Sequence, residues 1–504
     1  MATREEYLLG IDSSTQSTKA CVWSPSGRLI AKAASNIRVE SPRTGWAEQD
    51  PNRWWSSTRS AIRKVLRQVG SERIAAIGLA YQRETFALLG RAGEALRPAI
   101  LWLDVRAEAE VKEVEKLVGR EGYHNTTGKP LDVTSALPRL LWLRRHEPES
   151  VKGAARWADV GSYLSHRLTG EYRTCVAGTD TCGLIGLKSR DWEGPYLDLA
   201  GLGREQLPEL VEPGDVIGRI APGAARQTGL PEGLPVVAAG GDGQVFSVGM
   251  NAVAPFSVTL TLGTSIVLGI SCADAPVSPL FRTLISASSG YVLECVLQSG
   301  TYLLRWFVET CAGSRRRNEA YWEQKVKDIA PGCEGLMTVP NWWGVRFPES
   351  LPDARGATIG WSNHHTFAHF YRSLLEGLAF ELRRAVGELE RTFPDRLERA
   401  IRTGGGGARS EVWIQILADV LNRPMSVNRQ DEVTALGAAI LAGVGVGILD
   451  DVASAAGEMV ALKNAREPAP ESAQLYCELF ERCYLPLFES AKPVSKELRR
   501  ITNA

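Results

Sequence analysis

Residues 8–24, LLGIDSSTQSTKACVWS, consist of two apolar runs on either side of a short turn rich in hydroxyl groups. Apolar runs separated by a polar turn predict a β-hairpin. Residues 256–271, FSVTLTLGTSIVLGIS, repeat the same design. A chain of 504 residues also exceeds what one hydrophobic core usually supports. We therefore expect two similarly built domains, residues 1–249 and 250–504, that meet near residue 250.

Strand and helix signals alternate along both halves of the chain. The run IAAIGLA at 74–80 predicts a buried strand, and Pro51 predicts the first turn of a helix. Residues 142–171 look helical. Apolar residues recur every three to four positions from Phe367, which predicts a long amphipathic helix. A further helix is expected to begin at Ser410, a residue type that caps helix N-termini. Alternating strands and helices are typical of an α/β protein.

The overall composition excludes several classes of function. Lysine plus arginine and aspartate plus glutamate both number 58, so no net charge attracts nucleic acid or an anionic membrane. The nine cysteines contain no C-x-x-C pair, which favours neither a disulfide framework nor a zinc site. The first residues lack the apolar core of a signal peptide, and no apolar run is long enough to span a bilayer. We expect a cytoplasmic protein with a small-molecule partner, and a homodimer is an open alternative for its assembly.

The hydroxyl-rich turns suit phosphate groups. Backbone N–H groups and hydroxyls in such turns form a concave site for phosphate oxygens. Lys19 would add a positive charge, whereas Asp12 would repel phosphate unless a Mg²⁺ lay between them. The glycine run 404–407 would let a ring or a phosphate approach the N-terminus of the helix that Ser410 begins. A hairpin turn with no ligand explains residues 13–18 alone equally well, so the hypothesis depends on all three features together.

Two further segments place polar side chains directly after predicted strands. Asp242, in AAGGDGQ, lies between glycines, where a carboxylate can accept the proton of a hydroxyl during phosphoryl transfer. Gln82, Arg83 and Glu84 follow the strand at 74–80, and their mixture of donors and acceptors suits a polyol. Asp104 adds a carboxylate nearby, although an ion pair explains that residue equally well.

Several separated segments occur in an order that resembles the FGGY family of carbohydrate kinases. They are the turn from Asp12 to Lys19, TGWAEQDP, QRET, RLTGE, GGDGQ, LGTS, TGGGGARSEVWIQILADVL and EVTALGAAILAG. Residues 356–377, GATIGWSNHHTFAHFYRSLLEG, are similar to one diagnostic pattern of the family. The similarity covers nearly the whole chain. It implies an α/β fold of two actin-like (ribonuclease H-like) ATPase domains, with ATP and a sugar in the cleft between them.

The resemblance also implies a role for each matching position. Asp242 falls on the catalytic base and Asp12 on a carboxylate near Mg²⁺, and both are candidate metal ligands. The candidate substrate-binding residues are Gln82, Arg83, Glu84, Asp104 and Asp242. The candidate ATP-binding residues are Asp12, Thr15, Gln16, Ser17, Lys19, Gly263, Thr264, Gly405, Gly406 and Ser410.

The chain departs from the family pattern at three places. Arg139 stands where many members have lysine, and Val345 stands where a glutamate is common. Ser410 and Glu411 replace the asparagines that often begin the helix of the adenosine site. These positions are therefore where this protein is expected to differ from its relatives.

Two sequence features disagree about which substrate accepts the phosphoryl group. The turn GIDSSTQSTK resembles xylulose kinases, whereas QRET resembles glycerol kinases, whose tyrosine after a TG turn is replaced here by Val133 or Thr134. We expect transfer of the γ-phosphoryl group of ATP to a primary hydroxyl of a small ketose, D-xylulose. Glycerol and other ketoses or polyols are alternatives, and an actin-like ATPase without sugar phosphorylation is a more distant one. The role of His364, His365 and His369 stays open.

Overall fold

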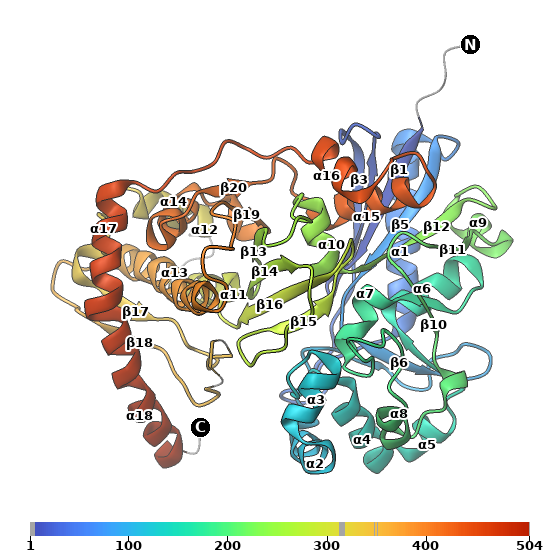
Figure 1. Ribbon diagram of the computed structural model, residues 1–504, viewed down its shortest axis with the longest axis horizontal. Helices are drawn as coiled ribbons and strands as arrows, with labels where there is room; N and C mark the ends of the chain where they lie inside the picture. The colour runs from blue at the N-terminus through green and yellow to red at the C-terminus, as the bar shows by residue number, and fades with distance from the viewer. Residues whose placement is uncertain (1–5, 312–317, 347, 350, 503–504) are drawn as a thin grey trace.

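The first sheet is built around the predicted N-terminal hairpin (Figure 1). The computed structural model describes residues 6–311, 318–346, 348–349 and 351–502. In the order β11-β12-β5-β1-β2-β3, the strands of this sheet are Val216–Arg219, Pro235–Gly241, Ile74–Tyr81, Tyr7–Ser13, Ser17–Trp23 and Leu29–Asn36. β1 pairs with β2 in antiparallel register and with β5 in parallel register.

The second sheet repeats this arrangement. In the order β15-β16-β14-β13-β19-β20, its strands are Arg282–Ile285, Tyr291–Leu297, Ile266–Cys272, Val258–Leu262, Ile401–Gly404 and Met425–Val427. β13 pairs with β14 in antiparallel register and with β19 in parallel register, as β1 does with β2 and β5. The two hairpins predicted from their hydroxyl-rich turns are confirmed, and so is the α/β fold with two actin-like units.

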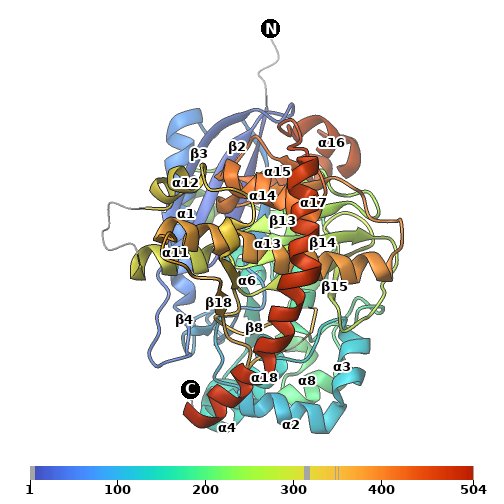
Figure 2. The same cartoon turned by 90° about the vertical axis from the view of Figure 1, so that its left-hand side faces the viewer.

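Helices and short strands surround the two sheets. The helices of the first half are α1 Pro51–Val69, α2 Glu108–Val118, α3 Arg120–Thr127, α4 Ala136–His146, α5 Pro148–Lys152, α6 Val160–Thr169, α7 Val176–Thr179, α8 Gly194–Ala200, α9 Pro222–Thr228 and α10 Asp242–Gly249. Those of the second half are α11 Thr301–Thr310, α12 Glu319–Val326, α13 Phe367–Thr392, α14 Glu411–Leu421, α15 Val433–Gly445, α16 Val452–Met459, α17 Pro470–Leu479 and α18 Leu485–Thr502. The short strands are β4 Glu48–Gln49, β6 Phe86–Leu89, β7 Ala99–Ile100, β8 Arg156–Asp159, β9 Arg173–Cys175, β10 Glu209–Val211, β17 Met337–Val339 and β18 Ala357–Ile359. Figure 2 shows α17 and α18 along the outside of the second half. Within the described residues, every helix is too short or too polar to cross a membrane.

The predicted helices form largely where their patterns placed them. The side chain of Asp50 caps α1 by accepting a hydrogen bond from Asn52 N, and Ser410 caps α14 by accepting one from Trp413 N. The apolar stripe that starts after Phe367 is buried along α13. The proline in the first turn of α1, the capping serine of α14 and the apolar period of α13 therefore located these three elements correctly.

One local prediction is wrong. Residues 142–171 are not one helical stretch, because β8 interrupts them and pairs with β6. Trp157 of β8 is fully buried in the main core of the first half, and this tertiary contact outweighs the helical pattern around it. Asp242 follows its strand as predicted, and it is the first residue of α10, which begins directly after β12.

Side chains of β1 alternate between two cores, as the period of a strand requires. Leu9 and Ile11 belong to the core that contains Trp54 of α1, whereas Leu8 belongs to the core that contains Leu436 of α15. α1 and α15 thus cover opposite faces of the first sheet, although α15 comes from the second half of the chain. The division at residues 249 and 250 stays a prediction, and the packing of α15 extends across it.

The backbone of α15 lies unusually close to the first sheet. A Cβ atom on Gly10 of β1 would lie 1.9 Å from the carbonyl oxygen of Ala435, and one on Gly78 of β5 would lie 1.9 Å from that of Ala438. A side chain at either position would overlap the helix backbone, so only glycine permits this approach. These contacts form a glycine seam, Gly10 and Gly78 against residues 435–438, that joins the two halves of the molecule.

Replacing Gly78 by alanine should lower the free energy of unfolding by about 1–3 kcal/mol, because the added methyl group meets helix backbone that cannot rotate away. Gly387→Ala is the matched control, since a Cβ on Gly387 of α13 meets nothing within 4 Å. That substitution should raise the stability by up to about 1 kcal/mol through helix propensity. Urea denaturation followed by circular dichroism measures both. An equal midpoint for Gly78→Ala and the wild type would contradict the close packing.

Candidate active site

The cavity that contains the predicted catalytic residues lies between the two halves of the chain. It has a volume of about 180 Å³, and Asp12, Arg83 and Asp242 line it together with Glu294 and Thr434. Its walls come from the first hairpin, α10 and the strands β13, β14 and β16. Asp12, Arg83 and Asp242, predicted from three separate segments, are therefore brought together.

Asp242 has the environment of a general base. Its side chain is 36% exposed, and its Oδ1 lies 3.1 Å from Arg83 Nε. The same oxygen accepts a hydrogen bond of 2.8 Å from Gly243 N. Burial raises the pKa of Asp242 to about 6, the Arg83 guanidinium opposes this rise, and the charge of Asp12 adds to it. A carboxylate that titrates near neutral pH and opens into a cavity is suited to accepting a proton.

Asp12 supplies a second carboxylate to the same cavity. Its Oδ1 accepts a hydrogen bond of 2.7 Å from Ser14 Oγ, and burial raises its pKa despite the nearby charge of Lys19. Asp12 and Asp242 fit a Mg²⁺, which proteins commonly hold with one or two carboxylates plus water and phosphate oxygens. The described residues contain no group of three or more histidine, cysteine, aspartate or glutamate side chains that could hold a metal alone. The pair therefore suits a metal that arrives with nucleotide phosphates.

Lys19 is engaged by a carboxylate in this structure. It lies opposite Asp12 in the register of β1 and β2, and its Nζ is 2.8 Å from Oε2 of Glu432, the residue before α15. Burial opposes the lysine charge, but Asp12 and Glu432 outweigh it and raise the pKa of Lys19. The Lys19 ammonium has three donors, so it can contact a phosphate oxygen as well as Glu432, and its predicted role stays a prediction.

A hydrogen bond links the tip of the first hairpin to Gln82, one of the candidate substrate-binding residues. Thr15 Oγ1 donates to Gln82 Oε1 and accepts from Trp102 Nε1, both at 3.0 Å. Gln16 is exposed and Ser17 is half-buried at this tip. Gln82 itself is buried, so it supports the turn and does not line the cavity.

Arg83 and Glu84, the next two candidate substrate-binding residues, both form ion pairs. Arg83 Nη1 lies 2.9 Å from Glu294 Oε2, and Glu84 Oε1 lies 2.5 Å from Arg282 Nη1. Burial opposes the charge of Glu294, yet Arg282 and Arg83 outweigh it and lower the pKa of Glu294 to about 2. Glu84 also has a positive φ of 53°, which is uncommon outside glycine and is often found at functional sites.

Arg139, one of the departures from the family pattern, holds the backbone of this segment. It is fully buried, and its guanidinium donates to the carbonyl oxygens of Ser135, Ile100, Leu101, Glu84 and Thr134. The distances to the Glu84 and Thr134 oxygens are both 2.5 Å. A lysine has only three donors on one atom and cannot reach five carbonyls. Arginine at this position therefore fixes the strained conformation of Glu84.

Asp104 lies away from the cavity. It is completely buried, and its carboxylate accepts hydrogen bonds from Ala47 N at 2.6 Å and from Arg106 Nη2 at 2.7 Å. The guanidinium of Arg106 also stacks 3.7 Å above the ring of Trp46. These contacts favour the ion-pair interpretation over the predicted contact with the acceptor.

A second cavity of about 330 Å³ contains part of the predicted adenosine site. Gly406 and Ser410 line it, and two carboxylates of α12, Glu319 and Glu323, face the same space. Gly405 does not line it: its φ of 92° forms the turn, and a Cβ there would lie 2.8 Å from Leu262 O.

The second hairpin is anchored beside this nucleotide cavity. Gly263 O accepts hydrogen bonds of 2.9 Å from the backbone nitrogen and the hydroxyl of Thr301, the first residue of α11. Thr264 is exposed at the tip. Since Thr301 also lines the nucleotide cavity, the hairpin and the cavity are neighbours.

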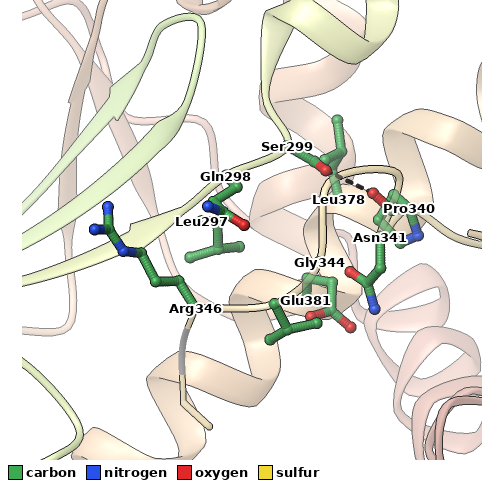
Figure 3. Close-up of a pocket in the computed structure, with 10 residues that line it drawn as sticks. Leu297, Gln298, Ser299, Pro340, Asn341, Gly344, Arg346, Leu378 and Glu381 are labelled. Atoms are coloured by element: carbon green, nitrogen blue, oxygen red, sulfur yellow. Dashed lines mark hydrogen bonds between the residues drawn. The ribbon is translucent and has the colours of Figure 1, made fainter. Parts of the chain in front are cut away.

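The segment around Val345 lies next to a much smaller cavity (Figure 3). It has a volume of about 10 Å³, and Gln298, Asn341 and Glu381 line it. That volume is close to the minimum for one water molecule, so no substrate binds there. Val345 is buried, and the adjacent Arg346 forms an ion pair with Asp132 of the first half.

The histidine cluster has no metal site. His364 Nε2 and His369 Nε2 lie 3.3 Å and 3.6 Å from Glu334 Oε2. His365 Nε2 lies 3.3 Å from the carbonyl oxygen of Glu334. Nevertheless, these side chains do not form a group that could hold a metal ion among the described residues. They connect the start of α13 to the loop before β17.

Sequence reasoning missed several residues that line the two cavities or contact the residues beside them. Glu294 is the most important, and its signal was available: it is the one charged residue in the apolar strand YVLECVL. Arg282 and Trp102 gave no comparable signal, because arginine and tryptophan are common at many kinds of site. The carboxylates of α12 were missed because no part of that helix resembles a motif.

Comparisons with known proteins agree with this geometry. Residues 7–249 match the N-terminal domain and residues 258–446 the C-terminal domain of the FGGY family of carbohydrate kinases. A xylulose kinase of Lactococcus lactis is 28% identical over 498 residues, covering 98% of each chain. A gluconokinase of Bacillus subtilis is 27% identical over 96% of this chain and 94% of its own. The crystal structure of a xylulose kinase from Rhodospirillum rubrum superposes with a TM-score of 0.87 at 27% identity, covering 97% of this chain and all of that one.

The chain belongs to the FGGY family of carbohydrate kinases. It is an ATP-dependent enzyme that transfers a phosphoryl group to an alcohol group of a carbohydrate.

Proposed function

We propose that the protein phosphorylates D-xylulose at its terminal primary hydroxyl, giving D-xylulose 5-phosphate. Relatives named xylulose kinase match nearly the whole chain, and so does a relative named gluconokinase. The family relationship thus leaves a neutral ketose and an anionic sugar acid as candidates. Magnesium as the metal and the cytoplasm as the location are parts of the same proposal.

The charge of the cavity supports a neutral acceptor. Among the described residues that line it, three carboxylates, Asp12, Asp242 and Glu294, accompany one guanidinium, that of Arg83. Arg83 is already shared between Asp242 and Glu294. A substrate carboxylate would therefore be desolvated without a free cation beside it, which is costly. A ketose brings only hydroxyl and carbonyl groups, so it avoids this cost.

The proposed mechanism assigns one role to each of these side chains. Asp242 accepts the proton of the primary hydroxyl while the oxygen forms a bond to the γ-phosphorus. The bond from that phosphorus to the bridging oxygen breaks, and its electron pair leaves with ADP. Lys19, Thr15 and Thr264 would donate hydrogen bonds to the negatively charged oxygens of the transferred phosphoryl group. When present, Mg²⁺ neutralises phosphate charge. Closure of the two halves around ATP and the acceptor would exclude water and so limit hydrolysis of ATP.

Glycerol remains the second candidate for a specific reason. Residues 82–85, QRET, resemble glycerol kinases, and Arg83 and Glu84 lie beside the base. However, the position where glycerol kinases have a tyrosine after the TG turn is occupied by small side chains, Val133 or Thr134. A three-carbon substrate would be held loosely there.

A coupled assay of ADP release tests the proposal with D-xylulose, L-xylulose, ribulose, glycerol, erythritol and gluconate. We expect kcat/KM for D-xylulose to exceed that for glycerol and gluconate at least roughly tenfold, the discrimination that a few pocket contacts supply. Faster turnover of gluconate would contradict the charge argument, and faster turnover of glycerol would contradict the ketose. ATP hydrolysis that no acceptor stimulates would favour an actin-like ATPase instead.

A further inference from the structure

The two halves of the chain meet at an edge strand of the second sheet. β15 is the outermost strand of that sheet. The outer edge of β15 forms hydrogen bonds to the first half of the chain. Thr283 N donates to Gly128 O at 2.8 Å, and Ile285 N donates to Asp180 Oδ2 at 3.0 Å. Figure 1 shows β15 beside α7 of the first half. Because an edge strand otherwise leaves its N–H groups unpaired, these bonds fix β15 to the first half.

Four charged side chains form a connected series of ion pairs where the two halves meet. Arg282 of β15 and Glu294 of β16 are directly opposite each other in the sheet. Glu294 Oε1 accepts a hydrogen bond of 2.9 Å from Arg282 Nε, and its Oε2 lies 2.9 Å from Arg83 Nη1. Arg282 Nη1 in turn lies 2.5 Å from Glu84 Oε1. Each half thus contributes one arginine and one glutamate to a charged junction of Arg83, Glu84, Arg282 and Glu294.

Stability alone does not explain this junction. Glu294 is 2% and Arg282 is 8% exposed, and their neighbours in β15 and β16, such as Leu284 and Leu293, are apolar and buried. Removing a charge from water costs several kcal/mol, and apolar residues of similar size usually stabilise a core as well or better. The partners of Glu294 and Arg282 are Arg83 and Glu84, the residues assigned to the acceptor.

We propose that Glu294 and Arg282 are positioning residues for the acceptor. From the second half of the molecule they hold Arg83 and Glu84 beside Asp242, so the acceptor site is complete only while the two halves are in contact. Both oxygens of Glu294 are occupied by arginines, so it acts through Arg83. The nucleotide cavity is lined only by residues of the second half and does not depend on this junction. This inference rests on the proposed assignment of Arg83 and Glu84 to the acceptor.

Steady-state kinetics of Glu294→Gln and Arg282→Lys test the proposal, with whichever acceptor the wild-type protein phosphorylates. Glutamine keeps the shape of Glu294 without its charge, and lysine keeps the charge of Arg282 but cannot bind two carboxylates as a fork. We expect the KM for the acceptor to rise roughly 10–100-fold, the usual effect of losing a charged hydrogen bond. The KM for ATP should stay within about twofold, since the nucleotide cavity is separate. If Glu294→Gln does not fold, Arg282→Lys carries the test.

Glu376→Gln is the matched control. Glu376 is a buried glutamate of α13 that bonds to Arg372 Nε and Tyr476 Oη, both at 2.8 Å, and it lines neither cavity. This variant should lower the melting temperature and leave the acceptor KM unchanged. Unchanged acceptor KM values in Glu294→Gln and Arg282→Lys would overturn the proposal, as would an equal rise in the KM for ATP. Absence of any acceptor turnover by the wild type would overturn the proposed function as well, and that result is visible before any variant is compared.

Discussion

Asp242→Asn should lower kcat by roughly 10²–10⁴-fold, the usual contribution of a general base. Asparagine is nearly isosteric with aspartate and can still accept the hydrogen bond from Gly243 N, so α10 should begin as before. The amide cannot take the proton of the acceptor hydroxyl, whereas the cavity around it is unchanged. Stopped-time assays of ADP release, together with calorimetric binding of nucleotide and acceptor, separate loss of chemistry from loss of binding.

The pH dependence gives a second readout of the same group. Burial raises the pKa of Asp242 to about 6, so kcat/KM of the wild type should fall below pH 6 as the base becomes protonated. Asp242→Asn should lack this acidic limb. Asp451→Asn is the control, because Asp451 caps α16 through Ala453 N and Ser454 N and lines neither cavity. Undiminished turnover by Asp242→Asn would exclude this residue as the base.

Asp12→Asn should lower kcat by about 10²-fold and raise the Mg²⁺ concentration needed for half-maximal activity. A metal ion contributes several kcal/mol of charge stabilisation in phosphoryl transfer, and this substitution removes one of the two carboxylates, Asp12 and Asp242, that fit the metal. Asparagine can still accept the hydrogen bond from Ser14, so the turn should keep its shape. Activity measured over a Mg²⁺ titration checks both effects.

Ser14→Ala is the matched control for Asp12→Asn. It removes the hydrogen bond to Asp12 and leaves the carboxylate, so the Mg²⁺ titration should shift much less. In the absence of Mg²⁺, ADP should bind Ser14→Ala as it binds the wild type, and it should bind Asp12→Asn at least as tightly, because that substitution removes a charge that repels phosphate. If Asp12→Asn showed the wild-type Mg²⁺ dependence and kcat, the metal would have to be held elsewhere.

Local signals predicted the elements whose form depends on neighbouring residues. The two hairpins follow from apolar runs around short polar turns, α1 from the proline in its first turn, α14 from its capping serine, and α13 from its apolar stripe. The same signals placed Asp12 and Asp242 at strand ends, and the structure brings both to one cavity. Spacing alone did not predict that cavity, and the resemblance to a family supplied it.

Contacts between distant segments were beyond prediction from the sequence. β8 forms because Trp157 is buried and the strand pairs with β6, and no residue near 157 indicates that partner. For Asp104 the sequence left an acceptor contact and an ion pair as equal alternatives, and the hydrogen bonds from Ala47 N and Arg106 favour the ion pair. Arg282 reaches Glu84 across the junction of the two halves, which depends on the packing of whole domains.

The glycine seam determines which parts of this enzyme can change during evolution. At Gly10 and Gly78 the helix backbone occupies the space that any side chain would need, so substitutions there act on the alignment of the whole molecule. The loops that carry Asp132 and Arg346 join the halves through half-buried side chains instead. Substitutions in such loops can therefore change the acceptor preference, whereas the glycine seam, which aligns the two halves, tolerates no side chain.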